Sequence, residues 1–270
     1  MMHPSPSARV SALLIALALA FGAAFVLAPG PLAGGGFADQ RALTDALDPA
    51  FVDYWNSGGR ALPPDLAGIV DYWSRYHLVK AVCAALLLTV LALLAVRLWH
   101  ALPTTGRLPR LAAAWALVTL LTTGAAALLM ANVQGTIAPF SSVLSLLPFR
   151  TPDSRLTIAL GQVRQQLTNF SSADHRTPQT AMMVADFGRY HAVIAVLTAI
   201  LTLVLLGMGV ATWRRLVRTA AADRRTRRLL GTFGALLATL TIAAALVLVA
   251  NTCTAANPAP ALLAFFNGGW

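Results

Sequence analysis

The chain has 270 residues, of which 57% are hydrophobic and only 11% are charged. Because soluble domains carry about 25% charged residues, this composition excludes a water-soluble globular protein. The formal net charge of +10 would suit nucleic-acid binding, but the basic residues are placed as in a membrane protein. We therefore expect a lipid bilayer around the chain and no nucleic-acid partner.

Five apolar segments are long enough to cross a bilayer as helices. The first, residues 10–28, has two interpretations: a retained span or a cleaved secretory signal peptide. Its apolar run is longer than the usual stretch of about 7–15 residues in a signal peptide, and this favours a retained span. The other four segments are residues 76–99, 111–131, 191–213 and 229–250. The pattern predicts an all-α polytopic membrane bundle of about five transmembrane helices, forming a single membrane domain over residues 1–270.

The long connections between these segments predict helices of their own. Asp153 or Ser154 can cap a helix with a single apolar face, made of Leu156, Leu160, Val163 and Leu167. Pro64 and Pro178 suit the first position of a helix, so the second and fourth spans should begin well outside the membrane. We therefore expect helical extracytoplasmic loops.

Arginines set the expected orientation, because cytoplasmic connections are rich in basic residues. The segment 214–228 contains seven Arg and one Asp, and the connection after the second span contains Arg97, Arg107 and Arg110 without an acid. The other nine Asp lie in the two remaining connections. The sequence thus predicts a multi-pass protein of the cell membrane with a cytoplasmic N-terminus, a cytoplasmic Arg-rich loop at 214–228 and an extracytoplasmic C-terminal segment at 251–270.

Two parts of the sequence resemble each other. Arg75-Tyr76-His77 opens the second span and Arg189-Tyr190-His191 opens the fourth, and the register continues without a gap to Trp99 and Trp213. A weaker match pairs residues 131–132 with residues 250–251. Both copies run in the same direction, so we predict an internal parallel repeat of units 41–99 and 155–213.

Three stretches carry a resemblance over nearly the full length of the chain. They are residues 71–77 (DYWSRYH), 131–135 (ANVQG) and 259–266 (APALLAFF). The chain resembles an uncharacterised family of multi-pass membrane proteins from actinobacteria. The resemblance implies no activity and no functional residue.

His77 and His191 are the candidate ligand residues, because histidine binds metals and titrates near neutral pH. Two histidines do not define a tight site, and the sequence leaves open whether the two motifs form one site. The alternative is an interfacial belt in which Arg75, Tyr76, Arg189 and Tyr190 act as interface residues. In that interpretation each Arg has a local acidic partner, at Asp71 and Asp186.

The middle of each predicted span lacks Asp, Glu and Arg, which proton relays and charged-substrate carriers need. Phosphate-binding and hydrolase motifs are also absent from the sequence. The polar residues there are threonines, which bond their own helix or pack helices closely: Thr89, Thr119, Thr122, Thr123, Thr198, Thr202, Thr239 and Thr241. We therefore predict no catalytic residue and no cofactor.

These observations lead us to expect an integral membrane envelope protein that presents a helical extracytoplasmic cap. It would act without enzymatic activity, as a scaffold or a subunit of a larger assembly, with other membrane or envelope proteins as partners. One alternative is a metal- or haem-binding membrane protein that uses His77 and His191. Another is a carrier of a small apolar or lipid substrate, which would not need charges inside the membrane.

Overall fold

The computed structural model describes residues 6–34, 36–101, 108–149, 153–170 and 176–268. Arg107 and Trp270 lie outside these ranges. All regular elements of the described chain are helices, as predicted. In chain order they are α1 (Pro6–Leu27), α2 (Pro29–Ala33), α3 (Gln40–Ser57), α4 (Pro64–Ala101), α5 (Leu108–Ile137), α6 (Pro139–Leu144), α7 (Ser154–Thr168), α8 (Pro178–Arg218), α9 (Arg224–Ala256) and α10 (Pro258–Phe266).

Five of these helices are long and apolar enough to cross a membrane, and they contain the five predicted segments except for residue 28, which follows the end of α1. The candidate spans are Arg9–Leu27 in α1, Pro64–Ala101 in α4, Ala113–Ile137 in α5, Pro178–Arg218 in α8 and Arg224–Ala256 in α9. The prediction of a multi-helix membrane protein is thus confirmed at the level of helix length and composition.

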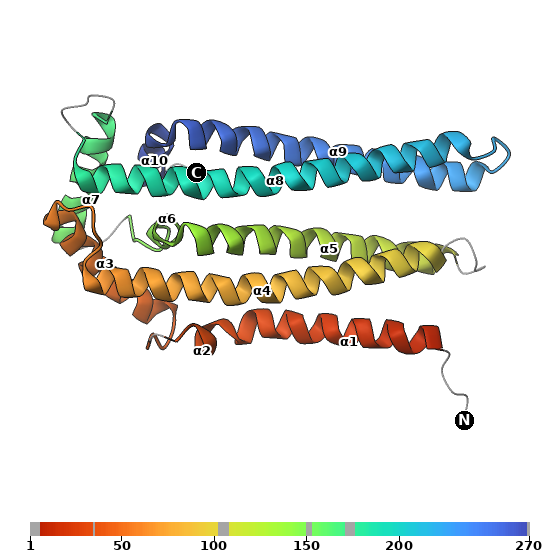
Figure 1. Cartoon of the computed structure of the whole chain (residues 1–270), viewed down its shortest axis with the longest axis horizontal. Helices are drawn as coiled ribbons and strands as arrows, with labels where there is room; N and C mark the ends of the chain where they lie inside the picture. Colours follow the sequence, from red (N-terminus) through yellow and green to blue (C-terminus); the bar gives the residue numbers. More distant parts are fainter. Residues whose placement is uncertain (1–5, 35, 102–107, 150–152, 171–175, 269–270) are drawn as a thin grey trace. The chain divides into compact units, whose positions relative to one another are not determined.

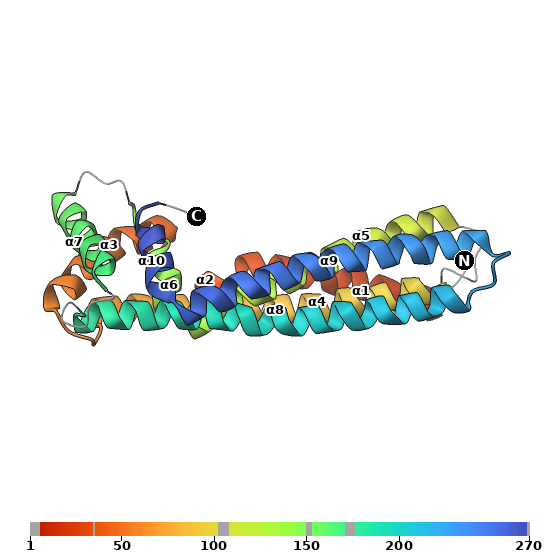
Figure 2. The same cartoon turned by 90° about the horizontal axis from the view of Figure 1, so that it is seen from above.

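The chain folds into two compact units. Unit 1 comprises Met1–Gln162 and Thr177–Gln179, and unit 2 comprises Val163–Arg176 and Thr180–Trp270. In unit 1, α4 and α5 lie side by side and α1 runs along α4 (Figure 1). Leu14 of α1 packs there with Val90, Leu94 and Val118. In unit 2, α8 and α9 lie side by side, and α10 follows at the end of α9 (Figures 1 and 2).

The helices begin where the sequence chemistry places them. Pro64 opens α4 and Pro178 opens α8, as predicted, because the fixed φ of proline suits a first helical position. Asp153 precedes α7, and its Oδ1 accepts a hydrogen bond from the backbone N–H of Arg155 at 2.7 Å. The four apolar residues predicted to share one face of α7 are all buried.

The largest fully buried side chains lie at one end of each hairpin, in the helices that follow or precede the spans. We call α3, α6, α7 and α10 the cap helices. Ten of these twelve side chains belong to cap helices, and the other two, Leu66 and Met183, lie in the first two turns of α4 and α8. The ten are Leu43, Leu47, Phe51, Tyr54, Phe140, Leu144, Leu156, Leu160, Leu262 and Phe266.

The Arg-rich segment 214–228 is mostly helical and not an extended loop. Helix α8 continues through Arg218 and α9 begins at Arg224, so only residues 219–223 connect them. Arginine is a good helix former, and its long side chain can reach water from a helix end. Asp223 is the N-cap residue of α9, because its Oδ1 accepts a hydrogen bond from the backbone N–H of Thr226 at 3.1 Å.

Candidate functional site: two histidine–asparagine pairs

In unit 1, His77 of α4 is hydrogen-bonded to Asn132 of α5. The His77 Nδ1 and the Asn132 Oδ1 are 2.9 Å apart. The Nδ2 of Asn132 donates to the carbonyl of Leu128 at 2.7 Å, so the amide oxygen is the atom that faces the imidazole. An amide oxygen only accepts hydrogen bonds, and the proton must therefore be on Nδ1. For a neutral imidazole, this contact favours the tautomer with the proton on Nδ1 and a lone pair on Nε2.

Aromatic and backbone contacts hold the ring in place. Trp73, one turn earlier in α4, meets the imidazole edge to face with 4.7 Å between ring centroids. On the α5 side, a Cβ at Gly135 would lie 2.7 Å from the Cγ of His77. Glycine at 135 therefore permits the close approach of α5 to the ring.

Unit 2 contains the same arrangement between α8 and α9. His191 Nδ1 lies 2.8 Å from Asn251 Oδ1, and Asn251 Nδ2 donates to the carbonyl of Val247 at 2.8 Å. Phe187 takes the place of the tryptophan, with its ring centroid 4.6 Å from that of the imidazole. The Nδ1 proton of His191 follows from the same reasoning, so both histidines have the same tautomer.

The second ring nitrogen of each histidine is buried and has no hydrogen-bond partner in the described part of the chain. A neutral imidazole nitrogen with a lone pair can accept a hydrogen bond or coordinate a metal ion. Within the described ranges, no group of three or more His, Cys, Asp or Glu side chains is placed to hold a metal ion. Each pair therefore offers one oriented ring nitrogen as a possible ligand atom.

The two predicted arginines make different contacts. The Arg75 Nε donates to the carbonyl of Ala33 at 2.7 Å, and its Nη2 donates to the carbonyl of Gly34 at 3.2 Å. The predicted local pair with Asp71 is therefore wrong, because the carbonyls at the end of α2 compete for this guanidinium. In unit 2 the predicted pair is present, with Arg189 Nη1 3.4 Å from Asp186 Oδ1.

The neighbouring tyrosines stack on aromatic rings of their own helices. The Tyr76 ring is parallel to that of Trp73 at 5.4 Å, and the Tyr190 ring stacks on Phe187 at 6.5 Å. The Nζ of Lys80 lies 5.2 Å from the centroid of Tyr76, one turn nearer the start of α4. The lysine side chain thus extends toward the cap end of its helix, the direction expected of a residue that reaches for the membrane surface.

All eight predicted mid-span threonines donate their hydroxyl hydrogen bond to a backbone carbonyl four residues earlier in the same helix. This is one of the two roles that the sequence predicted for them. These hydroxyls therefore form hydrogen bonds within their own helices.

Sequence reasoning named His77 and His191 but missed Asn132 and Asn251 as their partners. The signal was present, because the weak match of 131–132 with 250–251 includes both asparagines. A histidine at matched positions of two helices, each followed by an asparagine at matched positions of the next helix, indicates a pair of like contacts. No known protein family, curated protein or solved structure matches the chain.

Proposed function

We propose that this chain is an integral membrane protein that presents its cap helices to another envelope protein, as a scaffold or as a subunit of a larger assembly. The observation that supports the proposal is where the largest buried side chains lie along the chain. All twelve of the largest fully buried side chains lie in the cap helices or in the first two turns of α4 and α8. Within each unit, well-packed helices of this kind offer a rigid surface to a partner.

The chemistry of the spans supports a role without catalysis. Their threonine hydroxyls bond backbone carbonyls, and only 6–33% of the residues in each span window are buried inside the described structure. Proton relays and charged-substrate carriers usually need charged side chains at this depth, and the middle of the spans has no Asp, Glu or Arg.

We infer that the chain arose by parallel duplication of a unit with one long out-to-in helix. The support is a contact at matched positions: His77 with Asn132, and His191 with Asn251. The short helices that follow the asparagines also begin alike, at Pro139 and Pro258. With the Arg-rich connections in the cytoplasm, the cap helices and the C-terminus would be extracytoplasmic.

Site-specific photo-crosslinking in intact cells tests the partner directly. A crosslinking residue is placed at the exposed α3 positions Arg41, Asp45 and Asp53, one at a time. Matched controls carry it at Leu203 and Leu246, which are exposed on the long apolar helices. We expect one discrete adduct, with the same protein, from the α3 positions and none from the controls. The absence of an adduct at all three α3 positions would contradict the proposal for this face of the cap.

A second candidate function is ligation of a metal ion or haem by His77 and His191. The observation that favours it is that both Nε2 atoms are buried and have no hydrogen-bond partner in the described chain. Histidine ligands commonly donate their other ring N–H to a fixed acceptor, as both do here to asparagine. Metal analysis and an absorbance spectrum of the purified protein test this candidate, and stoichiometric metal or haem would favour it over the scaffold.

A further inference from the structure

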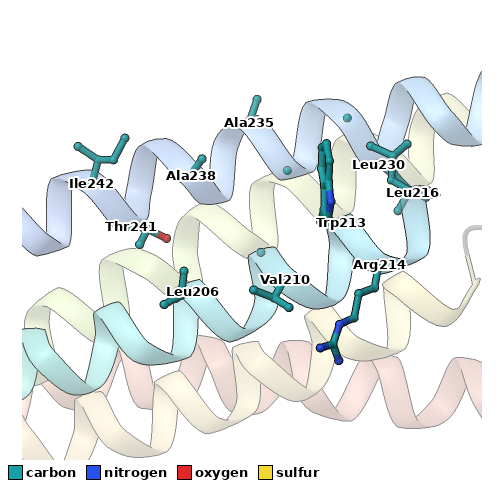
Figure 3. Close-up of a pocket in the computed structure, with 13 residues that line it drawn as sticks. Leu206, Val210, Trp213, Arg214, Leu216, Leu230, Ala235, Ala238, Thr241 and Ile242 are labelled. Carbon is teal, nitrogen blue, oxygen red and sulfur yellow. The ribbon is translucent and has the colours of Figure 1, made fainter. Parts of the chain in front are cut away.

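An open groove runs between α8 and α9 in the half of unit 2 that ends at the Arg-rich connection (Figure 3). Its volume is about 700 Å³, within the range of about 300–1,000 Å³ typical of small-molecule sites. Leu206, Val210 and Trp213 line it from α8, and Ala235, Ala238 and Ile242 line it from α9. The lining is almost entirely apolar, so a ligand must be apolar along most of its length.

The glycines that line the groove do not pack against the opposite helix. A Cβ added at Gly209, Gly231 or Gly234 would meet no atom within 4 Å. Large apolar side chains also remain uncovered beside it, with Leu206 52% exposed and Ile242 62% exposed. In a membrane such space is filled by lipid or by another helix.

A positively charged end adjoins the apolar groove. Arg214 lines the groove and makes no hydrogen bond or ion pair with any described residue. Asp223 is the only acid between residues 214 and 228, and its Oδ1 caps α9. A ligand that is long and apolar at one end and anionic at the other complements both features.

The position of Trp213 favours a flexible chain over a helix as the occupant. Figure 3 shows its side chain extending from α8 toward α9, while Arg214 extends away from α9. A straight helix with its side chains is about 10–12 Å wide, so it would meet this indole if it lay along the groove. A hydrocarbon chain can bend around it, with its headgroup outside the groove on the side of α8 to which the Arg214 side chain extends.

We propose that the groove between α8 and α9 binds an acyl chain of an anionic phospholipid, with the lipid phosphate at Arg214. This site is separate from the histidine–asparagine pairs. The inference goes beyond the proposed partner function and does not depend on it, since lipid binding and crosslinking at α3 are measured independently.

Native mass spectrometry of the full chain in mild detergent tests the site. The protein is incubated with phosphatidylglycerol or with phosphatidylcholine of the same chain composition. We expect wild type to retain one phosphatidylglycerol about tenfold more strongly than phosphatidylcholine. Arg214→Gln should remove this headgroup preference, and Gly231→Leu with Gly234→Leu should fill the groove and lower the retention of both lipids about tenfold.

The control is Gly207→Leu on α8, where a Cβ also meets nothing within 4 Å but which does not line the groove. Its lipid retention should equal that of wild type. If the filled variant keeps its lipid, or changes oligomeric state without losing lipid, the proposal is wrong and a helix is the better occupant. If the double leucine variant does not fold, a second measurement uses phosphatidylglycerol with brominated acyl chains, which quench nearby tryptophans.

The brominated lipid should quench a larger fraction of the tryptophan fluorescence in wild type than in Trp213→Phe. Equal quenching in the two proteins would overturn the proposal.

Discussion

Replacing Asn132 by leucine should destabilise unit 1 by removing the only acceptor that the described structure gives His77. The lost hydrogen bond is of ordinary length, 2.9 Å, and joins two neighbouring long helices. Hydrogen bonds between membrane helices contribute about 0.6 kcal/mol on average and up to about 1.7 kcal/mol. A buried donor left without a partner costs about 1–3 kcal/mol. Because His77 Nε2 already lacks a partner, the variant leaves the whole ring unpaired, and we expect a loss of about 1–3 kcal/mol.

The measurement is the free energy of unfolding in mixed micelles, in a double-mutant cycle of Asn132→Leu with His77→Phe. Phenylalanine keeps the aromatic contact with Trp73 and removes both ring nitrogens, so the double variant should recover part of the loss. The coupling energy should be about 0.6–1.7 kcal/mol. A coupling within about 0.3–0.5 kcal/mol of zero, the usual scatter of independent sites, would refute the view that this pair stabilises the hairpin.

Three further changes test other parts of the structure. Gly135→Ala places a Cβ 2.7 Å from the His77 ring and should cost about 1–3 kcal/mol of unfolding free energy, whereas Gly124→Ala, which meets nothing within 4 Å, should not destabilise. Burial raises the pKa of Asp48 in α3, so the folded state binds a proton at this carboxylate more tightly than the unfolded state does. Wild type should therefore lose stability relative to Asp48→Asn as the pH rises above 3.8, the ordinary pKa of the side chain. The two proteins should converge below that pH, and a constant difference in a pH series of unfolding curves would contradict the assignment. A reporter that is active only in the cytoplasm, fused after Trp270, should be silent, and a strong signal would reverse the proposed topology.

The long helices could be predicted from the sequence because their signals are local. Apolar runs of sufficient length give α1, α4, α5, α8 and α9, and proline marks the starts of α4 and α8. The apolar face of α7 follows from residue spacing alone. None of these features requires knowledge of which helices are neighbours.

The contacts of the site depend on tertiary structure and could not be predicted in this way. Arg75 has Asp71 one turn away, yet it donates to the carbonyls of Ala33 and Gly34, because α2 ends beside it in space. The bond between His77 and Asn132 likewise depends on the close approach of α5. Spacing along one helix gives candidates for such contacts, and packing decides among them.

The last prediction separates the two candidate functions by asking what the asparagines contribute. If the histidines are structural, Asn132→Leu and Asn251→Leu should each cost the same free energy in the presence of a chelator and of added zinc or haem. If each Nε2 is a ligand atom, metal or haem at 100 times its dissociation constant should stabilise wild type by about 2.7 kcal/mol. The asparagine variants should then bind about 10–100-fold more weakly, because the group that orients the ring is gone. Each Nδ1 is hydrogen-bonded to the asparagine of the neighbouring helix, a contact that stabilises the hairpin without a ligand, so we expect the first outcome. Stabilisation of wild type by metal or haem, lost in both asparagine variants, would show instead that the histidine–asparagine pairs are binding sites.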